Sequence, residues 1–442
     1  MQHFYPLTYA QQTIWNKEKY FPNTSINIIT GTLRFKDELD FGLLEKAINI
    51  LIKKNDVLKI KFAIRNGEPI QYVSEYEYYP LKFFDLSLEH DYQKFYDFEE
   101  ILTHTPLNII DSKIFYLAYF KLPGETALFF KFHHLIADAW SLMLIVNNIL
   151  FYYLRLSKNE KINEQQMAPS YIDYIQTEKN YINSENFLKS RAFWQTKIET
   201  IPEFIYLKNR PHQYSTKSKR ISFLISEDLS LKINQYCKER NISVFSLFTA
   251  ILSIYINRIT SKKDIILGTT VLNRLNHKEK NTIGMFVNTI PIRINIDKAM
   301  DFNSFVSYGY LEWKKILRNQ RYPHDLIIKD YRENNQITSD LFDVTITYQN
   351  AVLDSIKFFN KVKGRWHPNG HQTNSLHLHI NNRENSNNYV VNLDYLVNLF
   401  SATEIKEIYH HLMNLLIDAL YHPAKSVMSL EFLSVKEKQK IL

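Results

Sequence analysis

The sequence predicts an α/β fold built from two lobes. Segments in which apolar residues recur at helical spacing alternate along the chain with short segments that have the alternation of strands. The chain has 442 residues, of which 45% are hydrophobic. This is too long for one ordinary core, so two lobes of about 200 residues each are expected. We assign residues 1–205 to the first lobe and 206–442 to the second, because the stretch 207–219 is rich in turn-forming and basic residues.

The first lobe begins with an amphipathic segment. Apolar residues at helical spacing predict a helix over residues 41–54. Residues 128–134 alternate as in a strand, and residues 141–156 predict a strongly apolar helix directly after it. Residues 179–200 have the composition of a polar helix.

A second α/β pattern follows. Ser226 is a candidate cap for a helix that runs to about residue 239, and residues 243–259 predict a buried helix. Strands are expected over residues 264–270, 290–296, 342–348 and 375–380. The run Ser401-Ala402-Thr403-Glu404 has the form of a capping box and opens a last amphipathic helix.

Composition argues against several classes of protein. The chain has only nine glycines and neither GxGxxG nor GxxxxGK[ST], which argues against nucleotide sites of those types. The net charge of +8 is scattered, as expected for a lysine-rich solvated surface and not for a nucleic-acid partner. Cys237 is the only cysteine, which suits a reducing, cytoplasmic compartment. There is no signal-peptide pattern, and the apolar stretches are shorter than the ~18 residues of a membrane helix, so no membrane partner is expected.

The run Phe132-His133-His134-Leu135-Ile136-Ala137-Asp138-Ala139-Trp140-Ser141 is the strongest candidate for a site. If the strand continues through both histidines, His133 and His134 point to opposite faces and cannot chelate one metal together. His134 could take a proton from an attacking amine or hydroxyl, while Asp138 either orients its ring or fixes the loop through an ion pair. The alternative is a histidine that is satisfied within the core.

Further motifs follow one another over the length of the chain. They are Thr8 to Trp15, Lys54 to Phe62, His133 to Ala139, Tyr171 to Tyr174, Ile283 to Thr289 with Arg293, Asn319 to Pro323, and Leu341 to Val344 followed by Tyr348 to Asn350. Each motif alone is weak. Together and in this order they resemble the condensation domains of nonribosomal peptide synthetases, over essentially the whole chain.

The resemblance implies two lobes, each like chloramphenicol acetyltransferase, in a V-shaped pseudo-dimer with a central tunnel. Donor and acceptor thioesters enter from opposite ends on phosphopantetheine arms, and the acceptor amine attacks the donor carbonyl near the second histidine. No permanently bound cofactor is implied. The substrates are phosphopantetheine thioesters, namely acyl-CoA and a carrier-bound aminoacyl group.

The resemblance also assigns roles to residues. His134 is catalytic, either as general base or as the group that orients and stabilises the ammonium and tetrahedral species. His133 is structural, and Asp138 pairs with Arg274 of the second lobe as a structural ion pair. Residues expected at the substrate tunnel or its floor are Ala139, Trp140, Gly284, Asn288, Tyr348 and Asn350. Ala139 stands where the motif has glycine, so a positive φ at this position would be strained.

No metal is predicted. His377 and His379 share one face of a strand pattern, but no third ligand is evident. Surface or packing roles are therefore expected for both histidines.

Within the family, amide-bond formation fits best. The opening from Phe4 to Ser25 resembles the starter condensation domains of lipopeptide synthetases, which attach a fatty acyl group from coenzyme A to the first amino acid. The first motif begins about seven residues after Met1, which leaves little room for an upstream carrier. The end, Ser429 to Ser434, resembles the linker into an adenylation domain. Expected partners are therefore a peptidyl carrier protein as acceptor, acyl-CoA or a donor carrier protein, and an adjacent adenylation domain.

Three alternatives remain open. The first is an elongation condensation domain whose peptidyl or aminoacyl donor is held by a carrier protein. The second is a stand-alone acyltransferase of the same superfamily that acts on a small alcohol or amine. The third is a non-catalytic module that only recruits a carrier.

Overall fold

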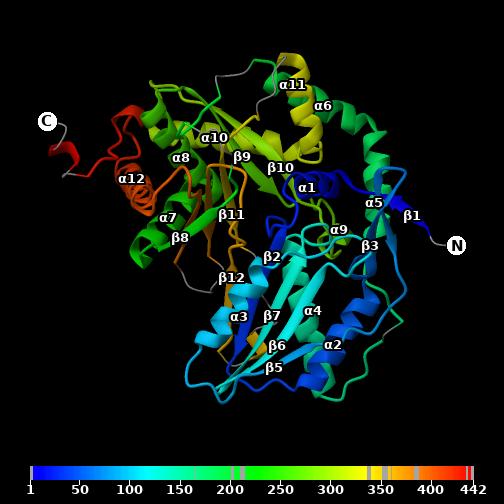
Figure 1. Cartoon of the computed structure of the whole chain (residues 1–442). Coiled ribbons are helices and arrows are strands. Elements are labelled where there is room, and N and C mark those ends of the chain that lie inside the picture. Colours follow the sequence, from blue (N-terminus) through cyan, green and yellow to red (C-terminus); the bar gives the residue numbers. More distant parts are fainter. Residues whose placement is uncertain are drawn as a thin grey trace. The chain divides into compact units, whose positions relative to one another are not determined.

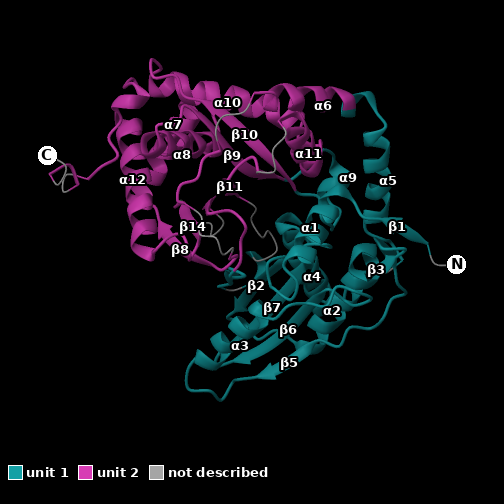
Figure 2. Cartoon of the chain, turned by 45° about the horizontal axis from the view of Figure 1, so that its top comes forward, with its two compact units in different colours: residues 1–187, 272–287, 351–370 teal, residues 188–271, 288–350, 371–442 magenta. Residues whose placement is uncertain are grey.

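The computed structural model of the chain describes residues 3–163, 165–200, 204–209, 215–335, 340–350, 357–359, 361–382, 388–434 and 437–439. The chain forms two compact units, coloured separately in Figure 2. Unit 1 comprises residues 1–187, 272–287 and 351–370, and unit 2 comprises residues 188–271, 288–350 and 371–442. The sequence had suggested one boundary after residue 205, whereas two later segments pack with unit 1. Such long-range returns of the chain leave no local pattern in composition.

Unit 1 contains two sheets. The larger has the strand order β12-β2-β7-β6-β5, with antiparallel neighbours except for the parallel pair β5 and β6. Its strands are β2 (Ile28–Phe35), β5 (Lys82–Asp85), β6 (Phe115–Leu122), β7 (Glu125–His133) and β12 (Lys363–His367). The smaller sheet has the order β1-β4-β3, from β1 (Phe4–Pro6), β3 (Ile60–Arg65) and β4 (Glu68–Val73).

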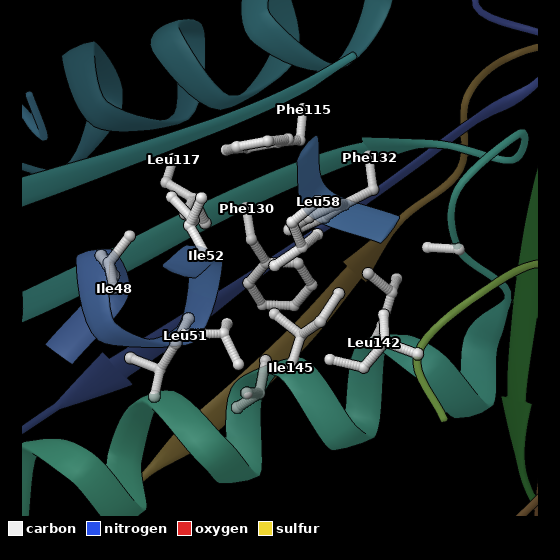
Figure 3. Packing of buried hydrophobic residues seen from close by; sticks show 14 of the residues in the cluster. Ile48, Leu51, Ile52, Leu58, Phe115, Leu117, Phe130, Phe132, Leu142 and Ile145 are labelled. Carbon is white, nitrogen blue, oxygen red and sulfur yellow. The ribbon is translucent and has the colours of Figure 1, made fainter. Parts of the chain in front are cut away.

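The helices of unit 1 are α1 (Tyr9–Tyr20), α2 (Phe41–Lys54), η1 (Asp56–Lys59), α3 (Gln93–His104), α4 (Ala139–Ser157), α5 (Tyr171–Ile182) and α9 (His277–Lys280). Helices α2 and α4 cover one face of the larger sheet, and α3 covers the other. Figure 3 shows side chains of α2 and α4, among them Ile48, Leu51 and Ile145, packed with Phe130 and Phe132 of the sheet. On the other face, Phe95 of α3 packs with Phe120 and Phe129. Strand β7 is therefore buried on both sides, which explains its nearly continuous apolar sequence.

Unit 2 is built on one sheet with the strand order β10-β9-β11-β13-β14-β8, of which β10, β9, β11 and β8 are labelled in Figure 1. Its strands are β8 (Ser218–Leu224), β9 (Asp264–Val271), β10 (Asn288–Asn295), β11 (Val344–Gln349), β13 (Leu376–Asn381) and β14 (Val390–Leu396). Its helices are α6 (Glu185–Ile198), α7 (Glu227–Arg240), α8 (Val244–Thr260), α10 (Phe302–Arg318), α11 (His324–Asn335), α12 (Ala402–Tyr421) and η3 (Val427–Ser429). Strand β11 runs parallel to both β9 and β13. Helix α8 packs against β9, β11, α10 and α12.

Most of the predicted elements are confirmed to within a few residues. Helix α2 has the predicted bounds, and the predicted capping box at Ser401 and Glu404 opens α12. The polar helix predicted near residues 179–200 is confirmed as α6, but it begins six residues later, because the chain breaks between α5 and α6. At this break the Ser184 hydroxyl donates to Tyr181 O and accepts from the Phe187 amide. A serine with these bonds satisfies helix ends that would otherwise be unpaired.

Among the described residues, α4 is long and apolar enough to cross a membrane, and α7 with α8 would pass only as one span bent by 104°. Leu142, Ile145 and Ile149 of α4 are fully buried, and so are most side chains of α8. These helices therefore serve as core helices of the two units.

Candidate active site

The two histidines lie at the end of β7, and the strand stops at the first of them. His133 is the last strand residue, and His134 begins a turn that the bond from Ile136 N to His133 O closes at 3.1 Å. The His134 amide donates to Asn27 O at 2.8 Å. Asp138 then forms the N-cap of α4. The residues between a buried strand and a buried helix are thus fixed from both ends.

The His134 side chain is partly buried. Its Nδ1 is fully buried and has no hydrogen-bond partner among the described residues. Burial lowers the pKa of His134 to about 4, and the nearby His133 and Lys17 add to this effect while Asp138 and the Ala137 backbone oppose it. The imidazole is therefore neutral near neutral pH, so one of its ring nitrogens has a lone pair that can accept a proton.

Asp138 does not hydrogen-bond to His134. Its Oδ1 accepts from the Ser141 amide at 2.7 Å, as an N-cap does, and its Oδ2 accepts from the Phe286 amide at 3.1 Å. Both oxygens also accept from Nη2 of Arg274 at 3.0 Å. Each carboxylate oxygen thus has two donors, and this acid holds the loop instead of relaying a proton.

Arg274 is fully buried, and its two terminal nitrogens bind backbone carbonyls as well as Asp138, while its Nε has no hydrogen-bond partner among the described residues. Its Nη1 donates to Glu279 O and Thr282 O at 2.6 Å, and its guanidinium lies 3.9 Å from the centre of the Phe286 ring. The predicted ion pair with Asp138 is present. Arg274 itself lies in unit 1, in the returning segment 272–287, and not in the second lobe as expected. The ion pair with Asp138 holds the segment 272–287 against the rest of unit 1.

Ser141 links the same helix to the segment that contains Gly284. Its hydroxyl donates to Gly284 O at 2.6 Å and accepts from Gly284 N at 2.9 Å and from Arg274 at 2.8 Å. A Cβ on Gly284 would lie 2.1 Å from the Tyr171 ring, so only glycine allows this approach. The Tyr171 hydroxyl donates to Met285 O at 2.7 Å. Sequence reasoning singled out Gly284 but not Ser141, whose signal was only its place within the first turn after Asp138.

Ala139 and Trp140 open α4. Ala139 is the first helical residue and is not among the described residues with positive φ, so alanine is unstrained where the motif has glycine. Trp140 Nε1 donates to Lys280 O at 2.8 Å, which ties α4 to α9. The doubt that the missing glycine raised about this loop is therefore removed.

Gln11 is a second residue that sequence reasoning did not single out by itself. Its fully buried side-chain amide donates to Leu135 O at 2.9 Å, in the turn that holds His134. The same amide pairs with the side chain of Gln71 on β4. In the sequence, Gln11 was recognised only as part of the first motif. Its partner Leu135 lies 124 positions further along the chain, so the bond between them could not be predicted.

Three predicted tunnel residues lie in unit 2. The Asn288 amide donates to Gln320 O at 2.8 Å and Tyr322 O at 2.7 Å, and its oxygen accepts from His324 N. Tyr348 is partly buried on β11, where burial raises the pKa of its hydroxyl, and Asn350 is exposed just after this strand. The structure thus brings together His134, Asp138, Arg274 and Gly284 in unit 1, while Asn288, Tyr348 and Asn350 belong to unit 2.

His377 and His379 pack within the sheet of unit 2. Their rings stack 3.6 Å apart, and the Thr347 hydroxyl contacts both, at 3.1 and 2.8 Å. His379 Nε2 contacts Asp394, which Arg220 binds with two hydrogen bonds. Burial lowers the pKa of His377 well below its usual value. In the part of the chain that the structure describes, no group of three or more potential ligands is arranged to hold a metal.

The chain was compared with known protein families and with known proteins. The model of the family "Condensation domain" matches residues 1–442. Surfactin synthase subunit 1 of Bacillus subtilis is 34% identical over 99% of this chain, and a plipastatin synthase protein of the same organism is 34% identical over 100% of it. The matched regions are 12% and 17% of these two proteins, so the chain spans less than a fifth of their length.

Solved structures share the fold. A starter condensation domain of rhizomide synthetase, solved in complex with C8-CoA, matches with a TM-score of 0.86 at 18% identity, covering 97% of this chain and 98% of that one. The first condensation domain of the calcium-dependent antibiotic synthetase matches with a TM-score of 0.84 at 17% identity, covering 98% of this chain and 99% of that one. At these identities the likeness concerns the fold, and it agrees with the predicted α/β class.

Proposed function

The chain belongs to the condensation domain family, whose members catalyse amide-bond formation, and we propose that its donor is a fatty acyl-CoA thioester. The acceptor is the amine of the first amino acid, held as a thioester on a peptidyl carrier protein. The reaction is then lipoinitiation, the N-acylation that begins a lipopeptide. The observation that carries this proposal is the likeness to surfactin synthase subunit 1 and to the plipastatin synthase protein.

A contrast among the relatives supports the starter assignment. Surfactin synthase subunit 2 is 23% identical over this chain, and two linear gramicidin synthase proteins are 21% and 20% identical. Subunit 1 of the same surfactin synthase is 34% identical. The rhizomide synthetase domain of the same fold is itself a starter domain and was solved with C8-CoA.

The chemistry follows from the neutral imidazole. The acceptor amine attacks the thioester carbonyl, the new C–N bond forms, and the C–S bond breaks. His134 accepts the proton that the amine nitrogen loses, and the proton returns to the leaving thiolate of coenzyme A. Because burial lowers the pKa of His134 to about 4, the ring is unprotonated at neutral pH and has a lone pair free for this proton, although it is a weaker base than an unperturbed histidine. Asp138 and Arg274 hold the turn and do not touch the reacting atoms.

The partners follow from the same proposal. The carrier protein brings the aminoacyl group, and an adjacent adenylation domain loads that carrier. No permanently bound cofactor takes part, because the reacting thioesters bring their own phosphopantetheine. The setting is the cytoplasm, where acyl-CoA is available to the donor side.

The test is intact-mass analysis of an aminoacyl-loaded carrier protein incubated with this chain. One reaction contains a medium-chain 3-hydroxyacyl-CoA, and another contains the same acyl group loaded on a second carrier protein. A mass gain equal to the acyl group with acyl-CoA alone supports lipoinitiation. Gain only from the loaded donor carrier would make the chain an elongation domain. Gain with a free amine but no carrier would make it a stand-alone acyltransferase, and no transfer in any reaction would favour a recruiting module.

A further inference from the structure

His133 is held in one tautomer by its neighbours. Its Nδ1 accepts from the Leu135 amide at 3.1 Å. A backbone N–H can only donate, so Nδ1 of the neutral ring carries no proton and Nε2 does. Nε2 faces Glu18 Oε2 at 3.4 Å, with the His133 side chain 1% and the Glu18 side chain 12% exposed.

Glu18, near the C-terminal end of α1, reaches the catalytic turn by a second route. The same Oε2 accepts from the Asn27 side-chain amide at 2.8 Å. The Asn27 carbonyl in turn accepts from the His134 amide at 2.8 Å. Oε2 of Glu18 thus contacts both Asn27 and His133. Asn27 in turn binds the amide of His134, and His133 binds the amide of Leu135.

We propose that Glu18 is a positioning residue for His134. This inference rests on the proposed function, in which His134 accepts the proton. Without the carboxylate, His133 loses the acceptor that favours its Nε2–H tautomer. In the other tautomer its Nδ1–H would face the Leu135 N–H, two donors opposed, and the bond that shapes the turn would be lost. Asn27 would at the same time lose the shorter of the two hydrogen bonds that its side-chain amide donates, and keep only the bond to Ile14 O at 3.3 Å.

The consequence is a loss of alignment and not of substrate binding. Glu18 touches the loop through His133 and Asn27, and its own carboxylate does not contact His134 in the described structure. Misplacing a reacting group by about 1 Å costs about 100-fold in rate. Loss of Glu18 should therefore lower kcat and leave the KM for the thioester substrates unchanged.

The experiment compares Glu18→Leu, Glu18→Asp and Glu18→Gln with the wild type in the acyl-transfer assay. Leucine removes the oxygen that accepts from Asn27 and His133. Aspartate keeps the negative charge, but its side chain is one methylene too short to contact both residues. Both should lower kcat by about 10–100-fold at a KM within about 2-fold. Glutamine keeps an acceptor oxygen at the same reach and should restore kcat to within about 3-fold of wild type.

Glu45→Leu is the matched control. Glu45 is another carboxylate of unit 1, on α2, which accepts from the Leu81 amide at 2.8 Å and the Tyr78 hydroxyl at 2.5 Å. Its loss removes comparable bonds without touching the turn, so kcat should stay at the wild-type value. Thermal unfolding midpoints of all variants are measured beside the kinetics.

Three results would overturn the proposal. These are wild-type kcat in Glu18→Asp or Glu18→Leu, a Glu18→Gln variant as slow as the other two, and an equal loss of kcat in Glu45→Leu. If Glu18→Leu does not fold, Glu18→Asp and Glu18→Gln decide by themselves. His134→Ala in the same assay separates a failure of the catalytic role of His134 from a failure of the positioning role of Glu18. Full activity of His134→Ala would refute its catalytic role, whereas an inactive His134→Ala beside a fully active Glu18→Asp would refute the role of Glu18 alone.

Discussion

Asp138 and Arg274 form an ion pair at 3.0 Å in which neither side chain is exposed to solvent. The pair joins the cap of α4 to the segment 272–287, which returns to unit 1 after the chain has built the first part of unit 2. Asp138 is thereby occupied and does not hydrogen-bond to His134. The histidine is therefore neutral near neutral pH, while Asp138 has a structural role.

Removal of one member of this pair should destabilise unit 1. Asp138→Asn leaves the Arg274 cation buried without its counter-charge, and Arg274→Met leaves the carboxylate unpaired. Each should lower the free energy of unfolding by about 3–5 kcal/mol, as measured by urea titration. Unchanged stability in both variants would show that the buried pair does not hold the returning segment.

Replacement of Gly284 by alanine should disturb the site through packing. The new Cβ would meet the Tyr171 ring at 2.1 Å, and overpacking of this kind costs about 1–3 kcal/mol. Gly309 on α10 is the matched control, because a Cβ there meets no atom within 4 Å. Gly309→Ala should stabilise the protein by about 0.5–1 kcal/mol, since alanine favours helix. Equal unfolding free energies for the two alanine variants would contradict the close approach at Gly284.

Restoring the glycine of the family motif should not improve the enzyme. Ala139 is the first residue of α4 and needs no positive φ. Ala139→Gly should therefore keep acyl transfer within a few-fold of wild type and lower stability by up to about 1 kcal/mol. Kinetics and thermal unfolding of this variant check both points. A large gain in kcat would mean that the loop needs a conformation that alanine resists.

Stability should fall in mild acid because of His134. Burial lowers the pKa of His134 to about 4 in the folded chain, against about 6.5 in an unfolded one. Between these values the unfolded chain binds a proton that the folded chain does not, so stability is full above about pH 6.5 and falls as the pH drops towards 4. The unfolding midpoint of His134→Ala should therefore drop less between about pH 7 and pH 5 than that of wild type. The exposed His410 is the control, and His410→Ala should follow the wild-type curve. Parallel curves for all three proteins would contradict a lowered pKa of His134 in the folded chain.

Local patterns in the sequence predicted local structure well. The helix over 41–54 was predicted at its observed bounds, because its apolar positions repeat on one face. The strand that ends at the histidines was predicted to begin three residues too late and to end one residue too late, because alternation continues into the turn that the bond from Ile136 N to His133 O closes. A resemblance of motifs, and not periodicity, led to the Asp138–Arg274 pair.

Contacts between distant residues could not be read from the sequence. Ser141 and Gly284 are 143 positions apart, and the bonds between them depend on how the returning segment crosses α4. Strand β12 pairs with β2 although more than 300 residues separate them. The local composition of β12 does not reveal this pairing, so it could not be predicted. The sequence showed that His377 and His379 share one face of a strand. It did not show that Thr347, whose hydroxyl contacts both rings, lies beside them on another strand.

The measurement that tests the central claim most directly is the rate of acyl transfer by His134→Ala. Wild type, His134→Ala and Gly309→Ala are incubated with acyl-CoA and aminoacyl-loaded carrier protein, and the acylated carrier is followed by intact mass over time. The account predicts that His134→Ala is folded and slower than wild type by about 10²–10⁴-fold, while Gly309→Ala is as fast as wild type. A folded His134→Ala that transfers the acyl group at the wild-type rate would contradict it.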